Sequence, residues 1–274
     1  MASLTLITKA LSAITPAQWC QIFFGISSAT VLAIQMIPKA AQHLLLDYGA
    51  RSPASTGDQA KEPAGPKGSN VFMDIVRAVA SVGQIPHSWF MHFYVTSIAS
   101  SAFWAWQYLQ GGSAITSIAA QQAASETPSM RFEQTVLVWA LMALQVSLRE
   151  TTKPDFGNLL SPTAVVGTVT YLYGWINQHL CHKHLASLKK YSLPDRGLFR
   201  YLVCPHYTCE CLIYLGLAIT AAPEGLFINR TVLCALWFIV ANLGTTADGT
   251  KEWYAQKFGS EKVAGKWRMI PFIF

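Results

Sequence analysis

Charged residues are scarce in this chain. Of its 274 residues, 12% are Asp, Glu, Lys or Arg, whereas 52% are hydrophobic. Soluble domains carry about 25% charge, so this deficit argues against a soluble globular protein, and the aromatic content of 12% argues against a disordered chain. The composition predicts a membrane protein with no nucleic-acid partner. The formal net charge of +6 then bears on orientation in the bilayer.

Several motifs are also absent. The sequence contains no GxGxxG, no P-loop, no nucleophile elbow and no internal repeat, so a bound nucleotide is not held by a Rossmann turn. The six cysteines lie mostly in or beside apolar runs of a long chain, which predicts buried thiols and not a disulfide scaffold. The first residues are only weakly apolar, so we expect no cleavable signal peptide.

The apolar residues form runs of spanning length. A bilayer core about 30 Å thick needs about 20 apolar residues in a helix. Six candidate spans are residues 17–37, 89–110, 132–148, 157–178, 208–222 and 226–245. Of these, 157–178 is weaker, because it contains Pro162 and three glycines. The sequence therefore predicts an all-α, polytopic transmembrane helical bundle with about six spans. Residues 52–70, rich in Pro, Gly, Ser and charge, are expected to form a flexible cytosolic loop.

Lys and Arg gather in three of the connecting segments. Residues 38–88, residues 179–207 and the tail after 246 carry five each, which predicts that all three are cytosolic and that the C-terminus is too. The spans 89–110 and 132–148 return the chain to the cytosol at Arg149, and residues 179–207 are cytosolic as well. The chain must therefore cross the membrane an even number of times between Arg149 and Gln178. The interval is short, so either 157–178 is re-entrant, or 179–207 breaks the charge rule, or one span is missing.

A first candidate site opens the span at 89–110. Residues 86–94 read Pro-His-Ser-Trp-Phe-Met-His-Phe-Tyr. Two imidazoles and a phenol are costly at membrane entry unless they face a cavity or the headgroup layer. The segment is either an interfacial aromatic belt or the mouth of a substrate channel in which His92 or Tyr94 donates a proton.

Further candidates follow in the second half of the chain. Residues 179–184 combine His and Cys, but they sit on a basic segment without a nearby carboxylate, so a basic helix end that pairs with phosphates is favoured over a metal site. Residues 197–210 then bring Arg, His, Tyr and Glu together where the chain enters the membrane again, and an ionisable group such as Glu210 is a functional candidate there.

The last segments are basic and aromatic. Asn242 lies in the last span, and Lys251, Trp253, Tyr254 and Lys257 follow it, as does the end segment 266–274. Cations beside stacking aromatics suit an anionic, ring-bearing ligand such as a dinucleotide. The alternative is a basic cytosolic tail that touches anionic lipid. Asn229 matches a glycosylation sequon, but it lies too close to the membrane for us to expect modification.

Four blocks of this sequence resemble the steroid 5-alpha reductase family, and within it the polyprenol reductase branch. They are Tyr48–Arg51, the PHSWFMHFY segment, GLFRYLVCPHYTCECLIYLG with the upstream QHLCHKHLASLKK, and NLGTTADGTKEWYAQKF with the final MIPFIF. The resemblance implies one integral-membrane reductase domain over residues 1–274, with an NADPH-binding C-terminal half at 179–274. It also implies a multi-pass protein of the endoplasmic reticulum.

The resemblance implies a function as well: NADPH-dependent reduction of the α-isoprene double bond of polyprenal or polyprenol in dolichol biosynthesis, which supports protein N-glycosylation. Its partners are a long-chain polyisoprenoid and the bilayer, with no metal. An enal accepts hydride at its β-carbon because the charge moves to the carbonyl oxygen, where a donor stabilises it. We therefore favour the aldehyde as the electrophile. The alternatives are an isoprenylcysteine-type membrane methyltransferase and an inactive lipid-binding member of the family.

The resemblance also implies site residues. On the cofactor side they are His182, Lys189, Arg200, Tyr201, His206, Tyr207, Glu210, Asn242, Tyr254, Lys257, Lys266 and Arg268. The catalytic donor is expected to be His92 or Tyr94. The family has seven spans, and the stretch after Leu148 departs from its pattern, with one Arg and no Tyr. We therefore expect that one membrane segment is missing between 149 and 178.

Overall fold

The structure of the chain is a computed structural model. It describes residues 14–46, 71–83, 90–123, 134, 137, 138, 161–189 and 192–274. The regular secondary structure of these residues is helical, and among them the one β feature is an isolated parallel bridge between Leu202 and Trp267. The all-α prediction is therefore confirmed for the described part. The contacts divide the chain into two compact units, residues 1–31 with 121–274 and residues 32–120, and each unit is described by itself.

The first expected spans correspond to two helices of equal length. Helix α2 covers Pro16–Met36 and helix α5 covers Phe90–Gln110, each with 21 residues. α2 begins at a proline and ends just before Pro38, which has no amide hydrogen to continue the helix. Within the described residues, α2 and the later helix α10 are the two that are long and apolar enough to cross a bilayer.

Residues 32–120 also contain shorter helices that the sequence patterns did not predict. They are α3 (Lys39–Leu46), α4 (Val71–Gly83) and α6 (Ser113–Ala123). α3 and α4 contact each other. Before α6, Gly111 adopts a positive φ of 57°, and the side-chain oxygen of Gln107 accepts from the Ala114 amide at 3.2 Å. This turn separates α5 from α6.

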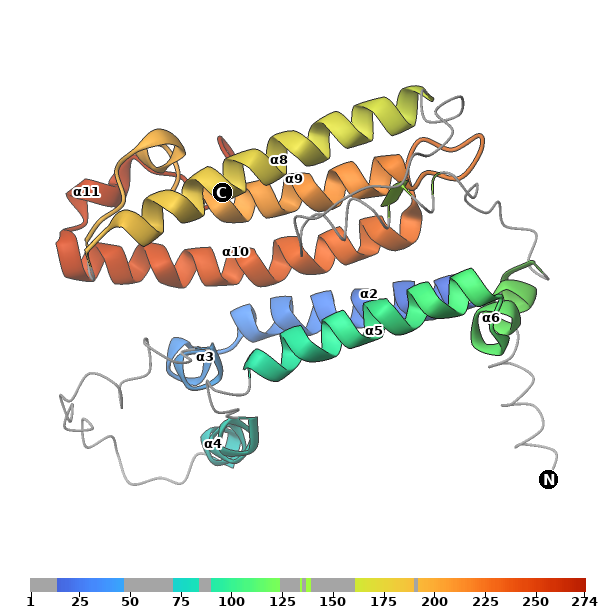
Figure 1. Ribbon diagram of the computed structural model, residues 1–274. Coiled ribbons are helices and arrows are strands. Elements are labelled where there is room, and N and C mark those ends of the chain that lie inside the picture. Colours follow the sequence, from blue (N-terminus) through green and yellow to red (C-terminus); the bar gives the residue numbers. More distant parts are fainter. Residues whose placement is uncertain are drawn as a thin grey trace. The chain divides into compact units, whose positions relative to one another are not determined.

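Three helices in the second half of the chain lie side by side (Figure 1): α8 (Pro162–Ser187), α9 (Pro205–Thr220) and α10 (Arg230–Phe258). A short 3₁₀ helix, η5 (Gly197–Arg200), precedes α9, and the short helix α11 (Glu261–Ala264) follows α10. α8 is continuous, although its glycines and Pro162 made 157–178 the weakest expected span. The proline stands in the first turn, where its missing amide costs nothing, and Ser161 caps the helix by accepting from Ala164.

Glycines let α8 and α9 pack backbone against backbone. A Cβ added to Gly216 would lie 2.5 Å from the Tyr171 nitrogen and 2.7 Å from the Gly167 oxygen. A Cβ added to Gly174 would lie 2.9 Å from the Cys209 oxygen. The glycines that weakened the span prediction are thus what permits this approach, as small residues do between membrane helices. Tyr171, Ile213 and Leu217 form the buried core beside them.

Helix α10 is longer than a bilayer requires. Its 29 residues extend about 43 Å at 1.5 Å per residue, against a hydrocarbon core of about 30 Å. Residues 231–247 carry no charge, whereas Asp248, Lys251, Glu252 and Lys257 follow. The last third of α10 therefore differs in chemistry from the rest, and it is this third that carries the site described below.

Asn229, the sequon residue, is a helix cap. Its side-chain oxygen accepts from the amides of Thr231 and Val232 at 3.0 and 3.1 Å, and its Nδ2 donates to the Ala221 oxygen at 3.0 Å. Cap removal costs about 0.5–2 kcal/mol. We expect Asn229→Ala to lower the melting temperature in detergent and Asn229→Asp, which keeps the acceptor oxygen, to recover most of the loss. Equal melting temperatures for wild type and Asn229→Ala would contradict the capping role.

Several expectations fall outside the described residues. Of the expected span 132–148, only Gln134, Leu137 and Val138 are described, and Gln134 donates to the Ala222 oxygen at 2.9 Å. The loop at 52–70 and the divergent stretch at 148–160 are not described. The number of spans and the missing segment therefore remain predictions.

Candidate functional site

The last residues of the chain pair with the segment that leads into α9. The Val203 amide donates to the Trp267 oxygen at 2.8 Å, the Cys204 amide to the Arg268 oxygen at 3.0 Å, and the Trp267 amide to the Tyr201 oxygen at 3.0 Å. Below this pairing, Met269 is fully buried and packs in a core cluster with Val203, Cys204 and Ala247. The start of α9, the end segment and α10 therefore form one packed structure.

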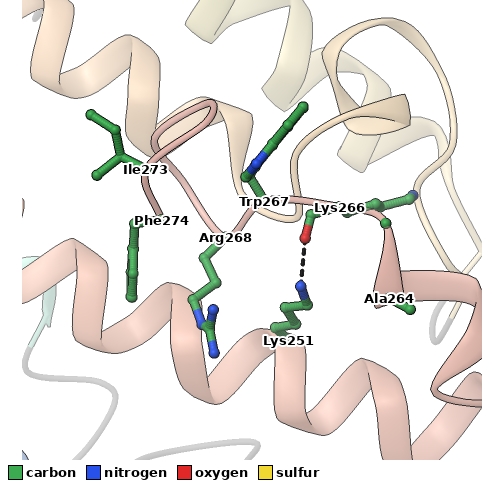
Figure 2. A pocket seen from close by; sticks show the side chains of 8 residues that line it. Lys251, Ala264, Lys266, Trp267, Arg268, Ile273 and Phe274 are labelled. Carbon is green, nitrogen blue, oxygen red and sulfur yellow. Dashed lines mark hydrogen bonds between the residues drawn. The ribbon is translucent and has the colours of Figure 1, made fainter.

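This structure borders an open pocket of about 230 Å³, which we call the cationic pocket (Figure 2). It is lined by Lys251, Ala264, Gly265, Lys266, Trp267, Arg268, Ile273 and Phe274. Lys251 on α10 donates from Nζ to the Lys266 oxygen at 2.5 Å. Lys266 in turn donates from Nζ to the Pro194 oxygen at 3.3 Å. Backbone carbonyls thus position both ammonium groups without neutralising them.

Arg268 is oriented by two contacts. Its Nε donates to the Asp248 carboxylate, and its guanidinium carbon lies 5.0 Å from the centre of the Phe274 ring, a cation–π distance. The described residues provide no hydrogen-bond partner for its two terminal amino groups. A guanidinium held in this way presents the planar pair of donors that a phosphate takes.

The surroundings of Lys266 shift the pKa of its side chain. Burial lowers the pKa of its ammonium, and the nearby Asp195 carboxylate opposes that shift. Among the described residues, the cationic pocket therefore combines three cations with two nearby carboxylates: Asp248 pairs directly with Arg268, and Asp195 lies near Lys266. An anion is the ligand that this charge balance favours.

A second group of side chains, which we call the histidine cluster, lies at the entrance of α9. The ring of His206 lies 4.2 Å from that of Tyr207, 5.4 Å from that of His182 and 6.1 Å from that of Phe199, measured between ring centres. The Nδ1 atom of His206 is buried without a hydrogen-bond partner in the described structure. A buried nitrogen in this condition is unusual, and a ligand or a water can supply its partner.

Burial, and secondarily His182, lowers the pKa of His206 to about 4 from 6.5. The unfolded chain takes up a proton near pH 6.5, whereas the folded chain resists it down to about pH 4, so stability is complete above this window and falls as the pH falls through it. We expect His206→Phe to reduce the loss of melting temperature between pH 7 and pH 4.5. Parallel pH curves for the variant and wild type would contradict this.

The structure brings some of the expected cofactor residues together. Lys266 and Arg268 share the cationic pocket, and His182, His206 and Tyr207 share the histidine cluster. Glu210, one turn further along α9, accepts from the Gln178 side chain of α8. Tyr254 packs against the core below the pocket.

Other expected residues line neither group. Lys189, Arg200, Tyr201, Asn242 and Lys257 are exposed. The carbonyl of Tyr201 nevertheless holds Trp267, and the Lys257 ammonium lies 5.0 Å over the ring of Trp253.

The two donor candidates lie on α5, in the other compact unit. The side chain of His92 is exposed, and that of Tyr94 lies outside the described residues. The choice between them stays open.

Sequence reasoning missed two contributors. Asp248 orients Arg268, and Gln178 holds Glu210. Trp267, which forms a wall of the pocket, lies in the end segment 266–274 that the sequence had indicated. Asp248 could have been found, because a carboxylate that follows 17 uncharged residues of a helix is an informative exception. No local signal identifies Gln178, whose role depends on the crossing of α8 and α9.

Comparison with known proteins places these groups in a wider context. Residues 126–274, more than half of the chain, match the sequence profile of a family described as 3-oxo-5-alpha-steroid 4-dehydrogenase. The matched region includes the cationic pocket and the histidine cluster.

Individual relatives carry a more specific name. "Polyprenal reductase 1" of Arabidopsis thaliana is 35% identical over 135 residues, which are 44% of this chain and 41% of the relative. "Polyprenal reductase" of Saccharomyces cerevisiae is 35% identical over 133 residues, 48% of this chain and 47% of the relative. That of Xenopus tropicalis is 28% identical over 120 residues, 40% and 37%. The chain thus spans less than half the length of these relatives.

Proposed function

Because the chain belongs to the steroid 5-alpha reductase family, we propose that it is a membrane-embedded oxidoreductase that reduces polyprenal with NADPH. The relatives named polyprenal reductase support the substrate class. The observation that carries the proposal is the cationic pocket within the family-matched region. In this proposal the protein acts in the endoplasmic reticulum membrane, with its end segment on the cytosolic side, and its product serves dolichol formation for protein glycosylation.

The residues of the cationic pocket fit the phosphates of a dinucleotide. Lys251 and Arg268 offer charged donors on the α10 side, Lys266 offers one that is directed away from these two, and Trp267 and Phe274 offer ring faces. The pocket is smaller than the roughly 300–1,000 Å³ that encloses a drug-sized ligand. It would therefore hold the phosphates, while the nucleoside parts lie outside it. The unpartnered Nδ1 of His206 provides a polar contact for a neighbouring part of the ligand.

NADPH supplies the hydride in this reaction. The protein's own contribution is to hold the anionic ligand and to place a donor at the carbonyl oxygen of the enal. Negative charge develops on that oxygen, and a hydrogen bond that strengthens with the charge lowers the barrier. The isolated double bond of polyprenol offers no such oxygen. The aldehyde is therefore the proposed substrate.

The donor is proposed to be His92 or Tyr94. We expect at least one of the variants His92→Ala and Tyr94→Phe to keep wild-type NADPH affinity and to lose most of its turnover. Loss of general-acid catalysis typically costs about 10²–10⁴-fold in rate. Fluorescence titration of NADPH and a stopped assay of polyprenal reduction measure the two effects separately. Full turnover in both variants would remove both residues from the donor role.

The decisive experiment measures NADPH oxidation by the purified chain in liposomes with a short polyprenal, and with the matching polyprenol as the control substrate. We expect turnover with the aldehyde alone. Protection against heat by NADPH and not by S-adenosylmethionine would separate the reductase from a methyltransferase. NADPH binding without turnover on either substrate, beside an active full-length relative, would favour the lipid-binding alternative and overturn the proposal.

A further inference from the structure

The end segment runs back along one face of α10. The Lys266 oxygen meets Lys251, Arg268 meets Asp248, and Met269 packs with Ala247. Finally, the Phe274 ring reaches Gly244, where an added Cβ would lie 3.6 Å from its Cε1 atom. Positions 251, 248, 247 and 244 share a face of the helix. From Lys266 to Phe274, the end segment therefore runs antiparallel to α10, towards the N-terminal end of that helix.

This direction takes the segment from the charged third of α10 into its uncharged stretch. Gly244 lies within residues 231–247, which carry no charge. The distance along the axis from Lys251 to Gly244 is about 10 Å at 1.5 Å per residue. The Lys251 side of the cationic pocket thus lies beside the charged third, whereas Phe274, which also lines the pocket, lies beside the uncharged stretch that has the composition of a membrane span.

The outer side of the segment at that depth is apolar and uncovered. Figure 2 shows Phe274 and Arg268 directed toward α10, and Ile273 and Trp267 directed away from it. Phe272 and Ile273 are 85% and 81% exposed, and the Phe272 ring lies 4.7 Å from that of Trp267 between ring centres. We call residues Pro271–Ile273 the aromatic tip.

Phe272 is held in an unfavourable conformation. Its φ of 65° makes it the one non-glycine residue of the described chain with positive φ, a region that aromatic residues rarely enter. The turn is closed on both sides, by the Phe274 amide on the Ile270 oxygen at 2.9 Å and by the Met269 amide on the Phe274 oxygen at 3.0 Å. Residues held in this way tend to have a role that outweighs the strain.

We propose that the aromatic tip is inserted into the bilayer and contacts lipid chains. Three observations favour lipid over a protein partner. The tip lies at the level of the uncharged stretch of α10. Cations that suit phosphate headgroups lie close by: the Arg268 guanidinium carbon is 5.0 Å from the centre of the Phe274 ring, and Lys251 lies about 10 Å away along that helix. Aromatic residues favour this boundary. Moreover, Trp237 lies on the same side of α10 as Gly244, two turns closer to the N-terminal end of the helix, and its side chain is also exposed, at 63%. The uncovered apolar surface therefore continues into the spanning part of the helix.

The test is site-specific photo-crosslinking in the full chain, reconstituted in phosphatidylcholine vesicles. Phe272 and, in a second variant, Ile273 are replaced by p-benzoylphenylalanine, and adducts are identified by mass spectrometry after irradiation. Trp237 in the uncharged stretch serves as the positive control, and exposed Gln256 in the charged third as the negative control. The second tip position covers the case in which the bulkier ring at 272 disturbs the turn.

We expect phospholipid adducts at 272 and 273 in yields comparable to those at 237, and none at 256. Two results would overturn the proposal while lipid adducts still form at 237. In the first, positions 272 and 273 crosslink to other parts of the chain or to a second copy. In the second, they crosslink neither to lipid nor to protein. The readout requires no turnover. A failure of the aromatic tip to reach lipid is therefore distinguishable from a failure of the reductase proposal.

Discussion

Arg268→Gln is expected to weaken NADPH binding by about 10- to 150-fold. Glutamine keeps much of the length of the side chain but removes the charge and the paired terminal donors. A hydrogen bond to a charged group is worth roughly 1.5–3 kcal/mol, and tenfold in affinity corresponds to about 1.4 kcal/mol. Fluorescence titration with NADPH gives the dissociation constant, and thermal melting in the same detergent reports the fold.

The matched control is Asp248→Asn. This variant breaks the same ion pair from the other side but leaves the guanidinium in the cationic pocket. If Arg268 binds a phosphate, Asp248→Asn keeps or improves NADPH affinity, because a competing carboxylate has been neutralised. If Arg268 serves only to hold the end segment, both variants lose affinity and melting temperature in parallel. That parallel loss would contradict the proposed role of the pocket.

Gly216→Ala is expected to destabilise the protein strongly, although it adds a single methyl group. The new Cβ would lie 2.5 Å from the Tyr171 nitrogen and 2.8 Å from its Cα. Both are backbone atoms, which cannot rotate away, so α8 and α9 must separate. Overpacking of this kind costs about 1–3 kcal/mol. The melting temperature in detergent should therefore fall, whatever ligand is present.

Two other glycines provide the controls. An added Cβ at Gly25 on α2 meets nothing within 4 Å, and one at Gly244 on α10 meets a single ring atom at 3.6 Å. At both positions alanine should be neutral or stabilising, because glycine costs a helix interior up to about 1 kcal/mol. A fall in melting temperature for all three variants alike would show that backbone contact between α8 and α9 is not the cause.

The helical fold was largely predictable from the sequence. Runs of spanning length identified α2 and α5 almost to the residue, because Pro16 and Pro38 mark the ends of α2. What composition could not supply is the packing of α8 against α9. The glycines of α8 reduce the hydropathy on which a span prediction depends, yet their value lies in contacts with α9 that only the folded helix pair reveals.

The sequence predicted the type of ligand that the candidate site would bind, but not which residues the fold brings together there. A concentration of Lys, Arg, His and aromatics indicated an anionic ligand, and Lys266 and Arg268 do share a pocket. Exposed Lys189 and Arg200 have the same chemistry in the sequence but do not line the cationic pocket. The difference depends on a long-range pairing, of residues 201–204 with residues 267–268, which no local pattern encodes.

That pairing has a consequence for how the protein matures. Leu202 and Trp267 are far apart in the chain, and synthesis proceeds from the N-terminal side. The helices α8, α9 and α10 are therefore made before the segment that completes the cationic pocket. Until residues 266–269 arrive, the place of Met269 beside Val203 and Ala247 is vacant and Asp248 lacks its arginine. Newly made molecules therefore pass through a stage in which α8, α9 and α10 are complete but the cationic pocket is not.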